Sequence, residues 1–292
     1  MADIAAIQPR VAPGRLARLG KFARRNPVMA FALALFATML LVSLFAPLIA
    51  THDPVQIDPG NRLKGPSWEN LFGTDAFGRD VFSRTVHGGR VSLAVGAAVA
   101  FFTTVAGLLI GMLSGYVRAI DPMVMRVMDG IMAIPGVLLA IAIMSVTKAS
   151  IGTVIFAITI AEVPRMVRVV RSAVLTIREQ PYIDAAIATG TRLHRLLLKH
   201  IMPNALAPVI VQATFVFASA VIIEAYLSFL GAGTPPEIPS WGNIMAEGRS
   251  LALLAIWVIL FPGLFLGVMV LATNLLGDSL RDMLDPRMRG RK

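Results

Sequence analysis

Acidic and hydroxyl side chains inside long apolar stretches are the residues of this sequence best suited to chemistry. Glu224 follows an uncharged run that begins at Ala205, and Ser228 stands one helical turn beyond it. A carboxylate inside a membrane is costly and often marks a solute or ion pathway. At about 1.5 Å per residue, however, Glu224 would lie near the outer end of its helix. Glu224 and Ser228 are therefore candidates for a translocation path or gate, although this position favours a structural role for Glu224.

The sequence lacks the patterns of several other kinds of site. Its only Gly-Lys pair, Gly20-Lys21, is followed by Phe22 rather than by Ser or Thr, so there is no P-loop for ATP. The four histidines are scattered and cysteine is absent, which argues against a metal site. No nucleophile and base stand out together, which disfavours an intramembrane enzyme. We expect a non-catalytic chain that binds no cofactor itself.

The composition is that of a membrane protein. Of 292 residues, 56% are hydrophobic and 15% are charged, and the hydrophobic residues gather in long blocks. The formal net charge is +10, and the basic residues collect beside these blocks. This distribution is typical of membrane topology, so we expect contact with membrane lipid and none with nucleic acid.

Six stretches are candidates for membrane-spanning helices, because crossing the hydrocarbon core takes about 20 apolar residues. They cover residues 28–50, 91–117, 130–147, a weaker stretch from 149 to 161, 205–223 and 251–277. The fourth is the least secure, since Glu162 and Arg165 interrupt its continuation. The first is too long for the core of a signal peptide, and we expect it to stay uncleaved. The sequence thus predicts an all-α polytopic transmembrane bundle of six spans.

Lysine and arginine predict the orientation of this bundle. They are concentrated at both ends of the chain and between the fourth and fifth spans, and the positive-inside rule places such segments in the cytoplasm. Both termini are therefore predicted to be cytoplasmic. The chain divides into a cytoplasmic tail (1–27), a transmembrane domain (28–277) with an outer segment (51–90) and an inner loop (172–203), and a second cytoplasmic tail (278–292).

Three contacts are expected near the ends of the spans. Trp241 stands in a second outer segment, residues 231–247, and is predicted to anchor at the membrane boundary, which indole prefers. Glu162 is expected to pair with Arg165, and Asp129 with Arg126, because residues three apart share a helix face.

The inner loop of residues 172–203 has the pattern of a helical hairpin. Small residues before Gly190 leave a helix surface that a partner's backbone can approach closely, and Gly190 itself permits a sharp reversal. After Gly190, leucines and basic residues fall on different faces, as in an amphipathic helix at a membrane interface. Pro203 suits the first turn of the next span. The spacing alone leaves a purely structural interfacial helix open.

At these positions the chain resembles a known family. Asp184-Ala185-Ala186, then Gly190, then Ile201-Met202-Pro203 are similar to the EAA loop, the signature of binding-protein-dependent permeases of the ATP-binding cassette importers. Gly73-Thr74-Asp75 and Gly78-Arg79-Asp80 narrow the resemblance to the dipeptide, oligopeptide and nickel permeases. The chain departs from the family pattern at Asp184, where glutamate is usual, and at Val163, where many relatives carry tryptophan.

The resemblance implies a type I importer permease fold in the bacterial inner membrane. The chain would form half of a translocation path for di- or oligopeptides, and a second homologous permease would form the other half. Its coupling loop would dock on one of two ATPase subunits, which bind ATP and Mg²⁺, while a periplasmic binding protein delivers the substrate. The implied coupling residues are Asp184, Ala185, Ala186, Gly190, Arg192 and Pro203. Those of the periplasmic family motif are Gly73, Asp75, Gly78, Arg79 and Asp80.

Two alternatives stay open. Nickel chelates or other small peptide-like solutes are alternative cargoes, because selection would rest largely with the binding protein. A secondary transporter driven by an ion gradient is the rival mechanism, although such proteins usually show internal repeats and this sequence has no convincing one.

Overall fold

The computed structural model describes residues 23–284, and all the regular secondary structure in this part is helical. The predicted cytoplasmic tails extend beyond it, and residues 1–22 and 285–292 lie outside the described residues. Within residues 23–284 there is no strand, only an isolated bridge between Thr74 and Asp80. The all-α prediction is confirmed.

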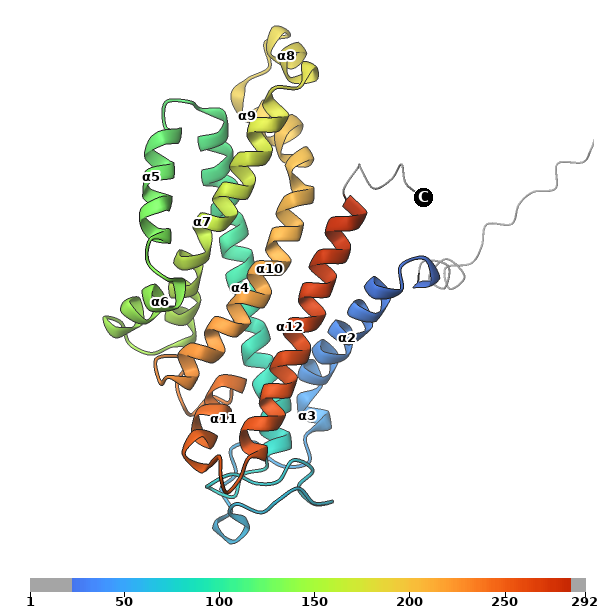
Figure 1. Cartoon of the computed structure of the whole chain (residues 1–292), viewed down its shortest axis with the longest axis vertical. Helices are drawn as coiled ribbons and strands as arrows, with labels where there is room; N and C mark the ends of the chain where they lie inside the picture. Colours follow the sequence, from blue (N-terminus) through green and yellow to red (C-terminus); the bar gives the residue numbers. More distant parts are fainter. Residues whose placement is uncertain (1–22, 285–292) are drawn as a thin grey trace, which may run out of the picture.

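Five long helices run side by side in the described chain (Figure 1). They are α2 (Pro27–Leu44), α4 (Val81–Tyr116), α7 (Ile151–Arg178), α10 (Met202–Phe229) and α12 (Trp257–Leu284). The shorter helices are α3 (Ala46–Ile49), η1 (Pro59–Asn61), α5 (Asp121–Met132), α6 (Gly136–Ser145), α8 (Pro181–Ala188), α9 (Leu193–Arg195), η2 (Leu196–Ile201), α11 (Trp241–Gly248) and η3 (Arg249–Leu251).

Four helical stretches of the described chain are long and apolar enough to cross a membrane. They are α2, α4, α12 and the continuous helix from Leu193 to Phe229, which includes α10. Helices α5 and α6 add a fifth if they count as one bent span. Helix α7 is 28 residues long, but its acidic and basic side chains lower its apolarity. The chain is a multi-pass membrane protein, and the number of six spans stays a prediction.

The prediction that residues 130–147 form a single continuous span, the third, is wrong. Helix α5 ends at Met132, α6 begins at Gly136, and their axes differ by 83°. Pro135 accounts for the break, because proline has no N–H to donate and disfavours helical backbone at Ile134. Asp121 and Asp129 of α5 bond to arginines of α7, while the uncharged α6 leaves at a steep angle.

The outer segment folds against the helices that follow it. Asp80 caps α4, because the Ser83 N–H donates to Asp80 Oδ2 at 2.7 Å, so residues 81–90 form the first turns of that helix. Phe72 stacks on Phe261 of α12 with a ring-centroid distance of 3.9 Å. The indole N–H of Trp257 donates to the carbonyl of Thr74 at 3.0 Å. The segment is thus an ordered cap over one end of the bundle.

Helices α4 and α7 form the most extensive helix pair of the described chain. Gly107, Gly111 and Gly115 stand at every fourth position of α4 and face α7. A Cβ added at Gly111 would lie 2.6 Å from the Cβ of Val170 and 2.9 Å from the carbonyl oxygen of Val167. Small residues at this spacing let two membrane helices approach closely, where dispersion contacts hold them. This packing positions α7, which leads directly into the predicted coupling loop.

Candidate functional site

The predicted coupling loop forms a small hairpin at one end of the molecule, beyond the ends of the long helices (Figure 1, top). Helix α8 carries Asp184 in its first turn, where the helix dipole favours a carboxylate. Ile183 and Ala186 are buried against the hairpin, whereas Asp184, Ala185 and Ile187 are exposed. One face of α8 therefore presents a carboxylate, a small side chain and an apolar side chain outward.

Gly190 ends this first arm in the left-handed conformation, with φ of 76°. Its N–H donates to the carbonyl of Ile187 at 2.9 Å, and the N–H of Thr191 donates to that of Ala186 at 3.1 Å. The two bonds form a Schellman motif, which closes a helix and turns the chain away. No neighbouring atom lies within 4 Å of the position of an added Cβ, so the outside of the turn is open. The predicted reversal at Gly190 is confirmed.

The second arm of the hairpin runs straight into α10. Helix α9, the π-helical η2 and α10 form one continuous stretch, with Arg192 just before it and Pro203 in the first turn of α10. The predicted amphipathic pattern is present, with apolar residues buried (Leu196, Leu197, Ile201) and basic residues exposed (Arg192, Arg195, Lys199). The prediction of a separate interfacial helix is wrong, because this arm is the beginning of a long helix.

At the opposite end of the molecule, residues of the periplasmic family motif form a buried ion-pair cluster. Arg84 donates to Asp75 Oδ2 at 2.5 Å and to the two carboxylate oxygens of Glu247 at 2.5 and 3.0 Å. Arg79 donates to the same Asp75 oxygen at 2.7 Å and also to Glu247. Asp75 and Arg84 are almost fully buried. The cluster fastens the outer segment to α4 and α11.

Gly73 and Gly78 shape the loop that carries Asp75. Both lie in the left-handed region, with φ of 74° and 75°. A Cβ at Gly78 would lie 1.7 Å from the carbonyl oxygen of Asp58, so only glycine is accommodated there. Asp75 Oδ1 accepts the backbone N–H of Phe77 at 2.8 Å and of Arg79 at 3.0 Å. The motif residues hold one another in place. Their role in the fold of the outer segment therefore explains why these residue types stand there.

Glu224 and Ser228, the predicted candidates for the path or gate, belong to a buried polar network. Glu224 is fully buried, and its two oxygens accept the hydroxyls of Ser92 at 3.0 Å and Ser228 at 2.8 Å. Ser228 Oγ lies 3.2 Å from Thr234 Oγ1, and the N–H of Trp241 donates to Ser92 Oγ at 3.3 Å. The network joins α4, α10 and α11. Its burial within one chain favours the structural alternative for Glu224.

The prediction that Trp241 anchors at the membrane boundary is wrong. Trp241 is fully buried, and its indole N–H donates to the carbonyl of Thr85 at 2.9 Å. Its ring lies edge-on to Phe265 with a centroid distance of 6.4 Å. Gly89 makes room for it, since an added Cβ there would lie 3.0 Å from the indole. Trp241 therefore packs between α4 and α12.

Helix α7 carries a polar stripe that was not among the predicted site residues. Arg165 and Arg168 are 60% and 47% exposed, and Ser172 and Thr176 continue the same helix face at four-residue spacing. Arg168, Ser172 and Thr176 line a cavity of about 520 Å³ together with Asn204 of α10. Charged side chains are costly against lipid, so this face needs water or protein beside it. The four-residue spacing of Arg168, Ser172 and Thr176 could have predicted this polar helix face from the sequence.

Glu162 lies almost fully buried beside this stripe. Its Oε2 is 3.7 Å from Arg165 Nη1, which confirms the predicted pair. Its other oxygen accepts the hydroxyl of Ser219 on α10 at 2.8 Å. Glu162 thus connects the stripe to the core between α7 and α10.

The prediction that Asp129 pairs with Arg126 is wrong. Asp129 of α5 instead accepts from Arg168 of α7 at 2.6 Å. Asp121 accepts twice from Arg171, at 2.5 and 2.6 Å. Because α5 packs beside α7, its carboxylates find partners across the helix pair rather than along their own helix.

Two family models match the chain. Residues 104–290 match the family described as binding-protein-dependent transport system inner membrane component. Residues 21–66 match the N-terminal transmembrane domain of oligopeptide transport permease C. The first match includes the α8 hairpin and the α7 stripe, and the second includes α2 and the beginning of the outer segment.

Curated relatives cover nearly the whole chain. A probable peptide ABC transporter permease protein, y4tQ, of Sinorhizobium fredii is 48% identical over 97% of this chain and 96% of its own. The dipeptide transport system permease protein DppC of Alkalihalophilus pseudofirmus is 41% identical over 91% of this chain and 88% of its own. The oligopeptide transport system permease protein OppC of Bacillus subtilis is 36% identical over the same shares of the two chains, 91% and 88%.

Solved structures of similar fold include a chain of the MetNI methionine ABC transporter in inward-facing conformations. The TM-score is 0.59 at 22% identity, over 70% of this chain and 97% of that chain. At this identity the likeness concerns the fold alone.

Proposed function

The chain belongs to the family of binding-protein-dependent transport system inner membrane components, and from this premise we propose that it is a permease subunit of an ATP-driven peptide importer. Peptide as the cargo is supported by relatives that are named as peptide, dipeptide and oligopeptide permeases. The structural observation that carries the proposal is the exposed α8 hairpin at one end of the bundle.

The α8 hairpin is proposed to couple this chain to an ATPase subunit. Its outward face offers Asp184, Ala185 and Ile187, a combination that suits a partner's groove with both apolar and basic positions. Gly190 leaves the turn without a side chain, so a partner's backbone can come close. Arg192 and Pro203 flank the second arm, where it enters α10. ATP-driven closure of two ATPases would then move this hairpin and switch the bundle between two states.

We propose that the α8 end faces the cytoplasm and the outer segment faces the periplasm. The basic residues around the hairpin support this orientation. Helix α7, at about 1.5 Å per residue, is long enough to span, and α5 with α6 would make one bent span. Six spans then place both termini in the cytoplasm, in a bacterial inner membrane.

The translocation path is proposed to lie along the polar stripe of α7. Arg165, Arg168, Ser172 and Thr176 need a polar environment that lipid does not provide. A second, homologous permease facing this stripe would enclose such a path. Glu224 and Ser228 would act at its outer end, where their network fixes α11 against α4 and braces the gate without contact with the solute.

The remaining parts of the importer would come from other chains. Two ATPases would bind ATP and Mg²⁺, and a periplasmic binding protein would select the peptide and deliver it at the outer segment. This chain would bind no cofactor and would catalyse no reaction of its own.

Purification and uptake test this proposal together. The tagged chain, purified from its own host in mild detergent, should bring two ATPases and a second permease, identified by mass spectrometry. Cells that lack the chain should lose uptake of labelled di- and oligopeptides, and the wild-type gene should restore it.

Two outcomes would contradict the proposal. A folded chain that elutes alone, with uptake that persists after ATP depletion while a proton gradient is held, would indicate a secondary transporter. Loss of nickel uptake with unchanged peptide uptake would assign a different cargo to the same type of importer.

A further inference from the structure

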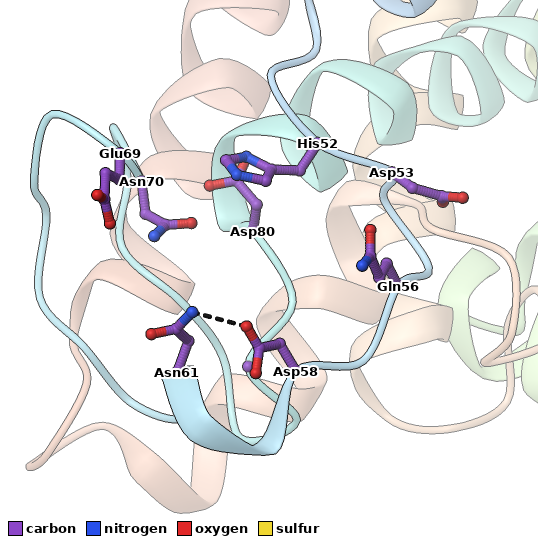
Figure 2. Close-up of a pocket in the computed structure, with 9 residues that line it drawn as sticks. His52, Asp53, Gln56, Asp58, Asn61, Glu69, Asn70 and Asp80 are labelled. Carbon is purple, nitrogen blue, oxygen red and sulfur yellow. Dashed lines mark hydrogen bonds and ion pairs between the residues drawn. The ribbon is translucent and has the colours of Figure 1, made fainter.

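The outer segment encloses a pocket of about 370 Å³ that none of the roles above uses (Figure 2). Its volume lies in the range of small-ligand pockets, roughly 300–1,000 Å³. The pocket forms before α4 begins, at the end of the molecule opposite the α8 hairpin. Its polar lining includes four carboxylates and three amides, those of Asp53, Asp58, Glu69, Asp80, Gln56, Asn61 and Asn70.

Among the described residues, basic side chains compensate only a small part of this negative charge. His52 is the one basic residue in the lining, and its Nδ1 lies 4.0 Å from Asp80 Oδ2. Arg62 donates to the backbone carbonyl of Ala76, whereas the ammonium of Lys64 donates to the amide oxygen of Asn61 in the lining and adds one positive charge against the four carboxylates. Carboxylates gathered in a concave site raise the local concentration of cations.

Asp80 contributes an unpartnered oxygen to the pocket wall. The residue is 3% exposed, and its Oδ2 accepts the N–H of Ser83 at 2.7 Å and the hydroxyl of Thr51 at 3.3 Å. Its Oδ1 accepts no hydrogen bond from the described residues. Figure 2 shows the carboxylate of Asp80 at the pocket wall, beside the ring of His52. A buried carboxylate oxygen without a donor is costly, so a donor that enters the pocket gains a bond here.

The geometry suits an ammonium group better than a metal ion. Calcium and magnesium need several oxygens converging at about 2.0–2.6 Å. Among the described residues, no three acidic or histidine side chains are placed to hold a metal. An ammonium group carries one charge and three donors, so it can bond one carboxylate and nearby amide oxygens without such convergence.

We propose that this pocket binds the primary ammonium group of a small cationic solute, the free amino terminus of a peptide on its way to the translocation path. Asp80 would accept the ammonium directly, and Asp53, Asp58 and Glu69 would add attraction at longer range. That the solute is a peptide rests on the proposed function, whereas the ammonium site rests on the pocket itself.

Binding to the complete purified transporter, without its periplasmic binding protein, tests this inference. Isothermal titration with dialanine should give binding, and N-acetyl-dialanine, which has lost the ammonium, should bind at least about tenfold more weakly, the effect of one charge-assisted bond. Cadaverine, which carries ammonium groups and no peptide bond, should compete with dialanine. Equal affinity for the acetylated and free peptides, or displacement of dialanine by Ca²⁺ but not by cadaverine, would overturn the proposal.

Variants of the pocket give a second, independent measurement. Asp80→Asn keeps a capping side chain for α4 and should weaken dialanine binding about tenfold. Glu69→Gln, with no fold-bearing contact among the described residues, should weaken it in the same direction. Glu237→Gln is the matched control, because Glu237 is an exposed acidic residue outside the pocket. Unchanged affinity in both pocket variants would reject the site.

The outcome is separable from that of the proposed function. ATP-dependent peptide uptake without ammonium binding at this pocket would reject the pocket and leave the importer standing. Ammonium binding that depends on Asp80, without any peptide uptake, would keep the pocket and reject the peptide both as its solute and as the cargo of the importer.

Discussion

At the scale of single residues, the molecule buries several charged groups but compensates most of them within the chain. The carboxylate of Glu224 accepts two serine hydroxyls, and Asp75 and Glu247 share two arginines. Removal of one member of such a group leaves its partners buried and unpaired, which costs more than the bond itself contributes. These residues therefore stabilise the outer half of the bundle.

Glu224 offers the clearest test at this scale. Glu224→Gln should keep the fold and most of the uptake, because an amide can bond both Ser92 and Ser228. Glu224→Ala should lower the free energy of unfolding by about 1–3 kcal/mol, since both hydroxyls lose their acceptor. Thermal unfolding of the purified complex, followed by tryptophan fluorescence, measures this loss. Abolished uptake in Glu224→Gln with unchanged unfolding would instead place Glu224 in contact with the solute.

At the scale of elements, close packing between α4 and α7 positions the hairpin. Gly111→Ala should destabilise the protein by about 1–3 kcal/mol, because the added methyl overlaps Val170 and the backbone of Val167. Gly267→Ala in α12 is the matched control, since its Cβ meets no neighbour, and better helix propensity should leave stability unchanged or slightly higher. Thermal unfolding compares the two variants. Equal stability of both would show that α4 and α7 are less tightly packed than described.

The turn of the hairpin gives a second prediction at this scale. Gly190→Glu should leave membrane insertion intact and abolish uptake, because a charged side chain would occupy the open side of the turn. Gly190→Asn is the control, since asparagine tolerates the left-handed backbone and carries no charge. Western blotting of membranes and peptide uptake separate insertion from transport. Wild-type uptake from a normally expressed Gly190→Glu variant would contradict the coupling role.

Sequence patterns predicted helices and the reversal at Gly190 well, because apolar runs and glycine act locally. Pro135 could have predicted the break between α5 and α6, and the glycines of α4 could have predicted close packing. The pairing of Arg84 with Glu247, 163 positions apart, could not be predicted, because it depends on how α11 returns to α4. The burial of Trp241 could not be predicted for the same reason, because it also depends on how α11 returns to α4.

At the scale of the whole molecule, the long helices expose many large apolar side chains on the surface of the single chain. Examples are Phe31, Leu40, Phe101, Leu109 and Leu264. Such a surface is unsuited to water and requires lipid or a partner permease around it. The charged exceptions lie on α5 and α7 and toward the two ends of the bundle.

The orientation of this surface is testable because the chain contains no cysteine. Trp68→Cys in the outer segment should react with a membrane-impermeant maleimide in spheroplasts, since Trp68 is 98% exposed. Ala188→Cys in the hairpin should react only after permeabilisation, because the proposed six-span topology would place that hairpin in the cytoplasm. Reaction of both residues from the same side would refute the six-span topology.

The two ends of the hairpin are attached unequally, and this gives the molecule a mechanical bias. On one side, extended backbone at Gln180 separates α8 from α7. On the other side, helix continues from Leu193 through the π-helical η2 and α10, which contains Pro208, to Phe229, five residues after Glu224. Under the proposed coupling, a push on the hairpin would be carried along α10, while α7 is packed against α4. The push would arrive where α10 meets α11, some tens of ångströms from the loop at about 1.5 Å per residue.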